Sequence, residues 1–494
     1  MILPAIMTCA ILALAGIFLA RDHRQMNLVC IIQAAAFVFI AVSYILSGQV
    51  PARLLAVGSP YFFVDHLGIY EILISAVIFT CAAIYARGYV DGLLASGELE
   101  KGSLRLFYIA WALLLPVLAI AFCADNLALF WIAAELTTII SAMLIAILAA
   151  RENIDAAIKY IFIASTAMLF SFAGFIFLFE ISRSVTGTGS LNWTVLLSEA
   201  SRFPEGMAMA AFVLVFIGFA AKSGIFPFHT WLPEAHAKAP SAVSAVLSGV
   251  LLNIGIYGII RVYAIVHQTA ASSTAALLLL IFGLLTVGIA AFSMFPQKNL
   301  KKLVAFSSVE NMGFILVGLA VSTPLAMFWV IFHILAHSVT KATLFLSAGI
   351  LHRQYRSRLS SEAVDDIHDV FRYQPLAAWG IIIGGLVIIG MPPFPVFFSK
   401  FFILVGLGAL SPALLFIMLV LLFIAAVAFG YFTITVFSRT TAPGQSQDLA
   451  PYKTPASMKI PVVVLLVLLV VLGIWFMGGE VSIIQNIITE LRFS

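Results

Sequence analysis

Unbroken apolar stretches of about 20 residues, the length of helix that crosses the hydrocarbon core of a bilayer, recur along the whole chain. Hydrophobic residues make up 63% of the 494 residues and charged residues only 10%. This is too little charge to cover the surface of a soluble protein of this size. The apolar residues do not alternate with polar ones, so the pattern excludes a transmembrane β-barrel. The sequence therefore predicts an all-α integral membrane protein.

Fourteen stretches are long and apolar enough to be predicted as membrane-spanning helices. They lie near residues 2–20, 27–47, 67–86, 106–122, 126–149, 157–180, 206–229, 240–265, 273–296, 301–321, 325–350, 375–406, 411–437 and 460–478. No basic segment precedes the first stretch, so we expect a retained helix rather than a cleaved signal peptide. The connections between the stretches leave no room for a separate soluble domain.

Lysine and arginine residues between the spans predict the orientation of the chain, because they concentrate on the cytoplasmic side of a membrane. If the N-terminus lies outside, clusters such as Arg353, Arg356 and Arg358 all fall on the cytoplasmic side. The exceptions are Arg53, Arg183, Arg202 and Arg492. This distribution predicts an even number of spans with both termini outside.

Several functions are excluded by what the sequence lacks. The net charge of +4 is small and scattered, which argues against a nucleic-acid-binding face. The four cysteines, Cys9, Cys30, Cys81 and Cys123, lie inside apolar stretches and form no CxxC pair, so no iron–sulfur cluster, zinc site or disulfide framework is expected. No G-x-G-x-x-G motif follows a predicted strand. We therefore expect no cofactor in this chain.

Ionisable side chains inside the apolar stretches are the strongest indication of function. Each costs a few kcal/mol to bury at bilayer depth, and such groups usually line an ion or proton path. The predicted set is Glu135, Lys222, His333, His337, Lys341 and Lys400, with Glu71 and Glu310 as further candidates nearer the span ends.

The residues His333, His337 and Lys341 follow one another at intervals of four, so they lie on one face of one helix. Imidazole titrates near neutral pH, and burial moves the pKa of an amine down towards the same range. The spacing therefore predicts a proton relay. The alternative is that the histidines are structural and hydrogen-bond to neighbouring backbone carbonyls.

Glu135 and Lys222 carry opposite charges in different spans, so the two side chains could pair. Pairing keeps both groups charged, whereas separation lets the lysine lose its proton. We interpret the two residues as a switch. The alternative is a static buried ion pair that fixes the register of the helices.

Proline and glycine interrupt two spans, each beside one of the buried lysines. Pro227 follows Lys222 in the seventh span, and Pro392, Pro393 and Pro395 precede Lys400 in the twelfth. Proline removes a backbone donor and clashes with the preceding turn, so both helices are predicted to be broken. Matched breaks indicate two inverted five-helix repeats. We predict these repeats at 106–265 and 266–437, between an N-terminal three-helix segment (1–105) and a C-terminal segment (438–494).

Other charged positions have simpler interpretations. Arg261 ends the eighth span, and we expect its side chain to extend to the outer interface. The loop after the broken seventh span carries a polar group that is either a proton entrance or an ordinary solvated loop: His229, Glu234, His236 and Lys238.

Several segments together resemble one known family. The segment KSGIFPFHTWLPEAHAKAPSAVSAVLSGVLLNIGIYGIIR is similar to the signature of the antiporter-like membrane subunits of complex I, Mrp antiporters and energy-converting hydrogenases. The segments FFVDHLGIY, NLALFWIAAELTTIIS, NLKKLVAFSSVENMGFILVGL and HILAHSVTKATLFLSAGIL resemble the same family. The resemblance covers roughly residues 60–430, and it is closest to hydrogenase-4 component F and then to component D of Mrp antiporters.

The resemblance implies roles for the matching positions. Glu135 and Lys222 would be the paired switch, the residues of the His333 stripe the central relay, and Lys400 the exchanger towards the outside. Where several members carry a lysine or a histidine on the eighth span, this chain has Asn253 and Ser248. Neither side chain titrates, so a proton path through the eighth span would need water molecules held by these two side chains. His236 and Glu234 are further accessory candidates.

The resemblance also implies a setting for the chain. We expect a proton-translocating subunit of a redox-driven complex in a prokaryotic cytoplasmic membrane. Its expected partners are other antiporter-like membrane subunits and hydrophilic iron–sulfur, hydrogenase or dehydrogenase subunits, which would carry the redox centres of the oxidoreductase. The alternatives are a subunit of an Mrp-type sodium/proton antiporter, a stand-alone solute or bicarbonate transporter subunit, and a purely structural membrane subunit.

Overall fold

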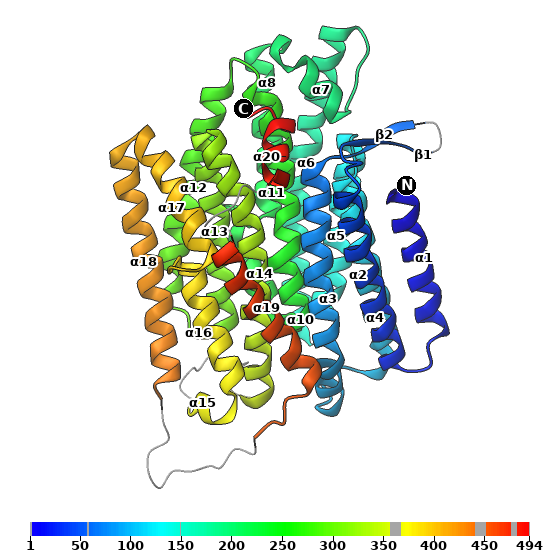
Figure 1. Ribbon diagram of the computed structural model, residues 1–494, viewed down its shortest axis with the longest axis vertical. Coiled ribbons are helices and arrows are strands. Elements are labelled where there is room, and N and C mark those ends of the chain that lie inside the picture. The colour runs from blue at the N-terminus through cyan, green and yellow to red at the C-terminus, as the bar shows by residue number, and fades with distance from the viewer. Residues whose placement is uncertain are drawn as a thin grey trace.

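The computed structural model describes residues 2–56, 59–148, 150–355, 367–439, 451–475 and 482–493. Arg356 and Arg358, which contributed to the predicted orientation, lie outside these ranges. The described chain forms a bundle of helices whose axes run mostly in one direction (Figure 1). Thirteen of these helices are long and apolar enough to cross a membrane, judged by length and composition.

The predicted spans correspond to helices in order along the chain. The N-terminal part holds α1 (Ile2–Leu19), α2 (His23–Leu46), α3 (His66–Ala95), η1 (Lys101–Ser103), α4 (Leu104–Phe122), α5 (Leu127–Ala146), α6 (Arg151–Thr186), α7 (Trp193–Glu199) and η2 (Ala200–Arg202). The middle part holds α8 (Glu205–Lys222), η3 (Phe228–Thr230), α9 (Trp231–Lys238), α10 (Ser241–Val246), η4 (Leu247–Leu251), α11 (Leu252–His267), α12 (Ser272–Met294), α13 (Leu300–Val321) and α14 (Pro324–Tyr355). The last part holds α15 (Val370–Tyr373), α16 (Pro375–Ile389), α17 (Pro395–Leu410), α18 (Pro412–Phe437), α19 (Ala456–Trp475) and α20 (Ser482–Glu490).

The predicted all-α class is confirmed, with one additional element that was not predicted. A short antiparallel hairpin, β1 (Ala52–Ala56) and β2 (Ser59–Val64), joins α2 to α3 at the end of the bundle where both chain termini lie (Figure 1). Termini on one face agree with an even number of spans. Which side of the membrane that face occupies stays a prediction.

The seventh predicted span is broken, as proline and glycine indicated. α8 ends at Lys222, and Gly224 follows in a left-handed conformation (φ +66°), where an added Cβ would lie 2.4 Å from Leu232. The backbone N–H of Phe226 donates to the hydroxyl of Thr286 on α12 at 3.2 Å. A backbone group freed by the break is therefore satisfied by protein, as membrane depth requires.

The twelfth predicted span is broken in the same manner. α16 ends at Ile389, Gly390 takes a positive φ of 88°, and α17 begins at Pro395. The ammonium of Lys400 on α17 reaches back to the carbonyl of Ile388 at 3.0 Å, which satisfies one of the unpaired carbonyls at the end of α16. Both predicted breaks are confirmed, whereas the division of the chain into two inverted repeats stays a prediction.

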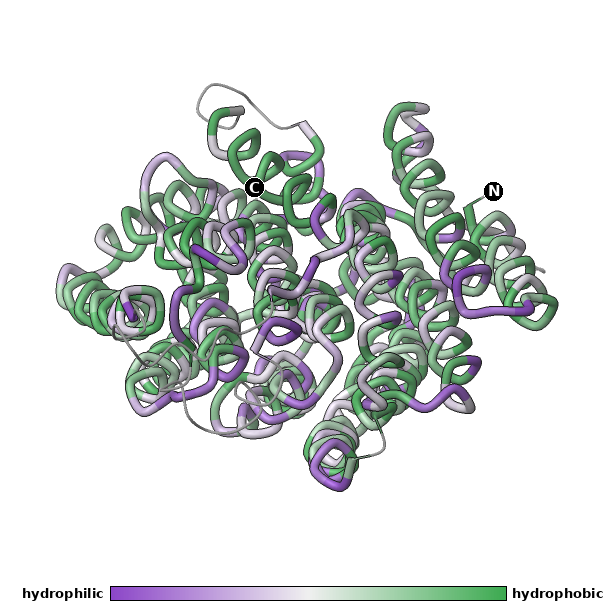
Figure 2. The backbone as a smooth tube through the Cα atoms, turned by 90° about the horizontal axis from the view of Figure 1, so that it is seen from below, coloured by the Kyte–Doolittle hydropathy of each residue, from purple (hydrophilic) through white to green (hydrophobic). Residues whose placement is uncertain are grey.

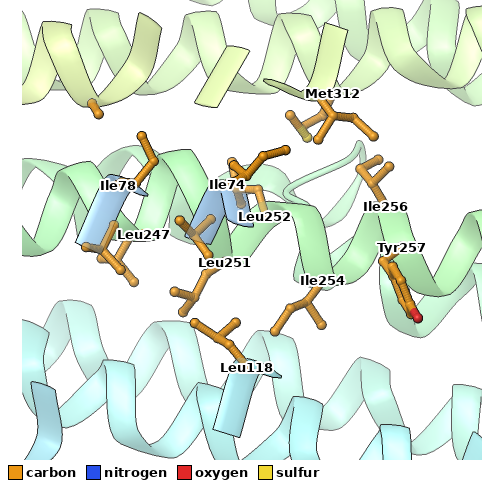
Figure 3. Close-up of a cluster of buried hydrophobic side chains, with 14 of the residues drawn as sticks. Ile74, Ile78, Leu118, Leu247, Leu251, Leu252, Ile254, Ile256, Tyr257 and Met312 are labelled. Atoms are coloured by element: carbon orange, nitrogen blue, oxygen red, sulfur yellow. The ribbon is translucent and has the colours of Figure 1, made fainter. Parts of the chain in front are cut away.

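The eighth predicted span contains a feature that periodicity did not indicate. Between α10 and α11, η4 is a five-residue π-helix, and all of its residues are buried. Hydrophobic side chains from α3, α4 and α13 surround this segment (Figure 3). The π-helix therefore lies in the core of the bundle, where such turns often mark functional sites.

The periphery of the bundle is strongly apolar. Seen from below, hydrophilic residues gather mainly in the connections, and the helices are mostly hydrophobic (Figure 2). Large side chains project outward on several helices, including Phe39 on α2, Phe162 on α6 and Phe423 on α18. Such a surface suits lipid or neighbouring membrane subunits, and the chain is a multi-pass membrane protein.

Candidate functional site

The predicted stripe on α14 exists and is enclosed by the bundle. His333, His337 and Lys341 have no exposed surface. The rings of the two histidines lie 6.5 Å apart, centroid to centroid, and are nearly parallel. The three side chains therefore follow one buried face of the helix.

Polar side chains from two neighbouring helices hold His333. Its Nδ1 lies 2.8 Å from the hydroxyl of Ser399 on α17, and its Nε2 lies 3.0 Å from Oδ1 of Asn311 on α13. The structural alternative for the histidines expected backbone carbonyls as partners. For His333 the partners are side chains instead, which place the ring in a polar network.

That network continues to a buried ion pair. The amide of Asn311 donates to Oε2 of Glu310, and Oε1 of Glu310 accepts from the ammonium of Lys400 at 3.0 Å. Both charged side chains are buried. His333, Asn311, Glu310 and Lys400 therefore form one continuous set of contacts across α14, α13 and α17.

Lys341 approaches the same ion pair from the other side. Its ammonium donates to the carbonyl of Val304 at 2.9 Å and to the hydroxyl of Ser307. Ser307 also lines a cavity of about 10 Å³ together with Glu310 and Lys400. This volume is about what a single water molecule needs, and the lining supplies several polar partners for one. Ser307 and Asn311 were not predicted as site residues, because neutral polar residues in a helix give no charge signal.

Glu135 and Lys222, the predicted pair, do not contact each other in this conformation. Lys222 is buried, and its ammonium donates to the carbonyl of Ala134 at 2.8 Å and to the hydroxyls of Thr137 and Thr138. Glu135, also on α5, is half-buried and accepts from Ser165 on α6 at 2.8 Å. The two groups are thus apart, and their role as a switch stays a prediction.

The two residues of the eighth span that do not titrate are both buried in polar contacts. Ser248 lies in η4, and its hydroxyl is 2.8 Å from the hydroxyl of Ser308 on α13. Asn253 donates to Glu71 on α3 and to Ser338 on α14, at 3.1 Å each. Glu71, a secondary candidate in the sequence, is therefore brought into the centre of the bundle.

The polar loop after the first break divides into surface and buried groups. Glu234 forms an exposed ion pair with Lys159, and Lys238 forms another with Glu152. His236 is buried, with its ring stacked 4.9 Å from that of Phe345. A cavity of about 380 Å³ opens at this end of the bundle, and its lining includes Lys238, Lys301 and His352. Glu234 and His236 therefore do not form one site.

The expectation for Arg261 was wrong. Its guanidinium is buried and binds both carboxylate oxygens of Asp65, and it also donates to the hydroxyl of Tyr257 at 2.6 Å. The ring of Trp193 lies 4.3 Å away. Asp65 precedes Arg261 by nearly 200 positions, so the local pattern around Arg261 gave no sign of a partner.

The charged groups do not gather as metal ligands would. Within the described ranges, no group of three or more histidine, cysteine, aspartate or glutamate residues is arranged to hold a metal ion. The four cysteines are free thiols. The buried arrangement instead consists of titratable groups, hydroxyls and a water-sized cavity, which can hold and pass protons.

Comparisons with known proteins agree on one family. A family model described as "NADH:quinone oxidoreductase/Mrp antiporter, TM" matches residues 124–428. The chain is 32% identical to a hydrogenase-4 component F homolog of Methylacidiphilum infernorum (isolate V4) over 72% of this chain and 74% of that protein. It is 29% identical to hydrogenase-4 component B of Escherichia coli (strain K12) over 70% of this chain, and it spans about half (51%) of that longer protein.

Solved structures share the fold of this chain. A chain in the structure of the Mrp complex from Dietzia sp. DQ12-45-1b superposes with a TM-score of 0.84 at 19% sequence identity. The superposition covers 99% of this chain and 96% of that one.

Proposed function

The chain belongs to the NADH:quinone oxidoreductase/Mrp antiporter family of membrane proteins, and from this premise we propose that it is a proton-translocating subunit of a redox-driven multisubunit complex. The family resemblance that the sequence motifs indicated is thereby confirmed. The observation that carries the proposal is the buried set of groups that links Lys341 and His333 to the ion pair of Glu310 and Lys400.

Each group in this set has a defined part in proton transfer. Lys341 releases a proton to a water in the cavity beside Ser307, and the lysine is left neutral. The proton then reaches the ion pair, where Glu310 accepts it and Lys400 is freed from its partner. Asn311 does not titrate, and it orients Glu310 and His333 towards each other. Transfer between such groups is efficient when burial brings their proton affinities close together.

Lys222 supplies the control step in this proposal. Its ammonium now donates to neutral acceptors of α5 that lie one to three residues from Glu135 along the chain. Movement of α5 against α8 brings Glu135 to Lys222 or separates them, and the separation favours release of the lysine proton. Partner subunits with iron–sulfur centres would drive that movement. We place the complex in a prokaryotic cytoplasmic membrane with both termini of this chain outside.

The test replaces Lys222 by Met in the assembled complex. Inverted membrane vesicles are supplied with NADH or hydrogen, and proton uptake is followed by quenching of an acridine dye. We expect electron transfer with strongly reduced proton uptake. Lys101→Met, at an exposed lysine that begins η1, is the matched control and should pump normally. Undiminished pumping by Lys222→Met would refute the proposal.

A second candidate is a subunit of a sodium/proton antiporter without a redox partner. The superposition on a chain of the Mrp complex favours it as the alternative. In that case an imposed pH gradient drives sodium movement in vesicles without any reductant. Sodium movement that Lys222→Met abolishes would favour this alternative.

A further inference from the structure

Glu71 is a buried carboxyl that the proposed proton path does not yet use. It lies on α3, its side chain is about 1% exposed, and α3 precedes both predicted repeats. Among the described residues, its side chain hydrogen-bonds to Asn253 and forms no ion pair. A carboxyl without a cation is costly at membrane depth, so its presence points to a function.

Three helices converge on this carboxyl. The amide of Asn253 donates both to Oε2 of Glu71 and to the hydroxyl of Ser338, at 3.1 Å each. Ser338 directly follows His337 on α14. The backbones are close as well, because a Cβ added at Gly249 would lie 3.0 Å from the carbonyl of Ser338. Figure 3 shows Ile74, one turn beyond Glu71, beside Leu252 of α11.

Several polar atoms on these same elements are buried and unpartnered. They are Oγ of Ser75 and Oδ1 of Asn253, each without a hydrogen-bond partner in the described part of the chain. Ser75 lies four residues after Glu71, on the same face of α3. Buried polar atoms nearly always have partners, and ordered water commonly provides them. The surroundings of Glu71 are thus suited to water.

On the opposite side, the segment around Asn253 contacts the end of α8. The hydroxyl of Ser223, the neighbour of Lys222, donates to the carbonyl of Leu252 at 3.0 Å. α11 therefore contacts α8 at the residue after Lys222 and α14 at the residue after His337, and Asn253 holds Glu71 between these two contacts. Asn253 cannot titrate, so Glu71 is the ionisable group of this interval among the described residues.

We propose that Glu71 carries protons between Lys222 and His337, with Asn253 holding its carboxyl in place. The carboxylate takes a proton from the Lys222 ammonium through water, which leaves a neutral amine and a carboxylic acid. The acid then gives the proton to the neutral imidazole of His337, and the carboxylate is restored. This inference rests on the proposed function, and it adds α3 to the path.

The test removes the carboxyl from position 71 and then places a carboxyl at position 253, on the other side of the same hydrogen bond. Glu71→Gln keeps the size and the hydrogen bond but cannot titrate, so proton uptake by the assembled complex should fall at least about tenfold. Glu71→Asp should retain part of the uptake. The double variant Glu71→Gln/Asn253→Asp exchanges acid and amide over the same contact, and it should recover uptake relative to Glu71→Gln. Glu199→Gln, which alters a carboxyl outside the spans, is the matched control and should be normal.

An infrared difference spectrum of the oxidised and reduced complex gives a second readout. A carboxyl band that changes on reduction should be absent from Glu71→Gln and shifted in Glu71→Asp; a purely structural carboxyl gives no such band. If Glu71→Gln fails to assemble, the shift of the carboxyl band in Glu71→Asp tests the inference instead. Normal uptake by Glu71→Gln, or an unshifted band, overturns the inference. If Lys222→Met has lost proton uptake in the same assay, normal uptake by Glu71→Gln overturns only the role of Glu71 and leaves the proposed function standing.

Discussion

Glu310 on α13 and Lys400 on α17 form a buried ion pair with 3.0 Å between Oε1 and Nζ, whereas Glu135 and Lys222 stand apart. Each of the two sets consists of a carboxylate on an unbroken helix and a lysine beside a helix break. One pair is closed and the other is open in the same conformation. If the two pairs alternate during turnover, Glu135 and Lys222 come together when Glu310 and Lys400 separate.

Breaking the closed pair from one side should be more harmful than removing it. Glu310→Gln leaves the buried Lys400 ammonium without its counter-charge, so we expect a loss of about 3–5 kcal/mol in stability and no proton uptake. Glu310→Gln/Lys400→Met should be more stable than Glu310→Gln alone. Thermal unfolding of the purified complex measures the stabilities. Glu180→Gln, which breaks an exposed pair with Arg183, should change little.

The ion pair of Asp65 and Arg261 should be structural rather than part of proton transfer. Asp65→Asn keeps the cap of α3, because the side-chain oxygen can still accept from the N–H of Gly68, but it leaves the guanidinium uncompensated. We expect the free energy of unfolding to fall by about 3–5 kcal/mol, with proton uptake per assembled complex unchanged. Asp22→Asn, at the exposed cap of α2, is the control. Loss of uptake in fully assembled Asp65→Asn would contradict this assignment.

The hydroxyl of Ser307 should matter for rate rather than for assembly. Ser307→Ala removes an acceptor from the Lys341 ammonium and a polar wall from the water-sized cavity. A hydrogen bond to a charged group is worth about 1.5–3 kcal/mol, so proton uptake should slow by about tenfold or more. Ser307→Thr keeps the hydroxyl and should pump nearly normally. Equal uptake by Ser307→Ala and the unmodified complex argues against water in this cavity.

Acid should weaken the contact between Glu98 and Arg353. Burial raises the pKa of Glu98, but hydrogen bonding from Ser96 and the charge of Arg353 outweigh it, so the pKa is lowered. The stabilisation is therefore present above the unfolded pKa of about 4.3 and is lost as the pH falls through the lower folded value. Glu98→Gln should cost about 1 kcal/mol or less at neutral pH and flatten the loss of thermal stability in acid. Unfolding temperatures of the unmodified protein and Glu98→Gln, measured from neutral pH to below the folded pKa of Glu98, test this prediction.

The spans and both helix breaks could be predicted because their causes are local. The hydrophobicity of a span and the missing N–H of a proline are properties of the local sequence, and neither depends on how distant segments pack. The stripe of His333, His337 and Lys341 follows from helical geometry in the same way.

The contacts of the site could not be predicted, because they depend on distant segments. Arg261 has the appearance of an interfacial arginine until α3 brings Asp65 to it. The separation of Glu135 from Lys222 depends on which side of α5 faces α8, a matter of packing rather than sequence spacing. Asn311 and Ser307 carry no charge, so only their neighbours reveal their importance.

The π-helix η4 sets which residues of the eighth span share a face. Its wider turn holds one residue more than an α-helical turn, so Ser248 faces α13 while Asn253 faces α3 and α14. Tightening that turn by one residue rotates all that follows by about 100°. Such a register slip would swing the Asn253 amide away from Glu71 and Ser338 together, without bending the rest of α11. The contacts of Asn253 with Glu71 and Ser338 therefore depend on the π-helical turn of η4.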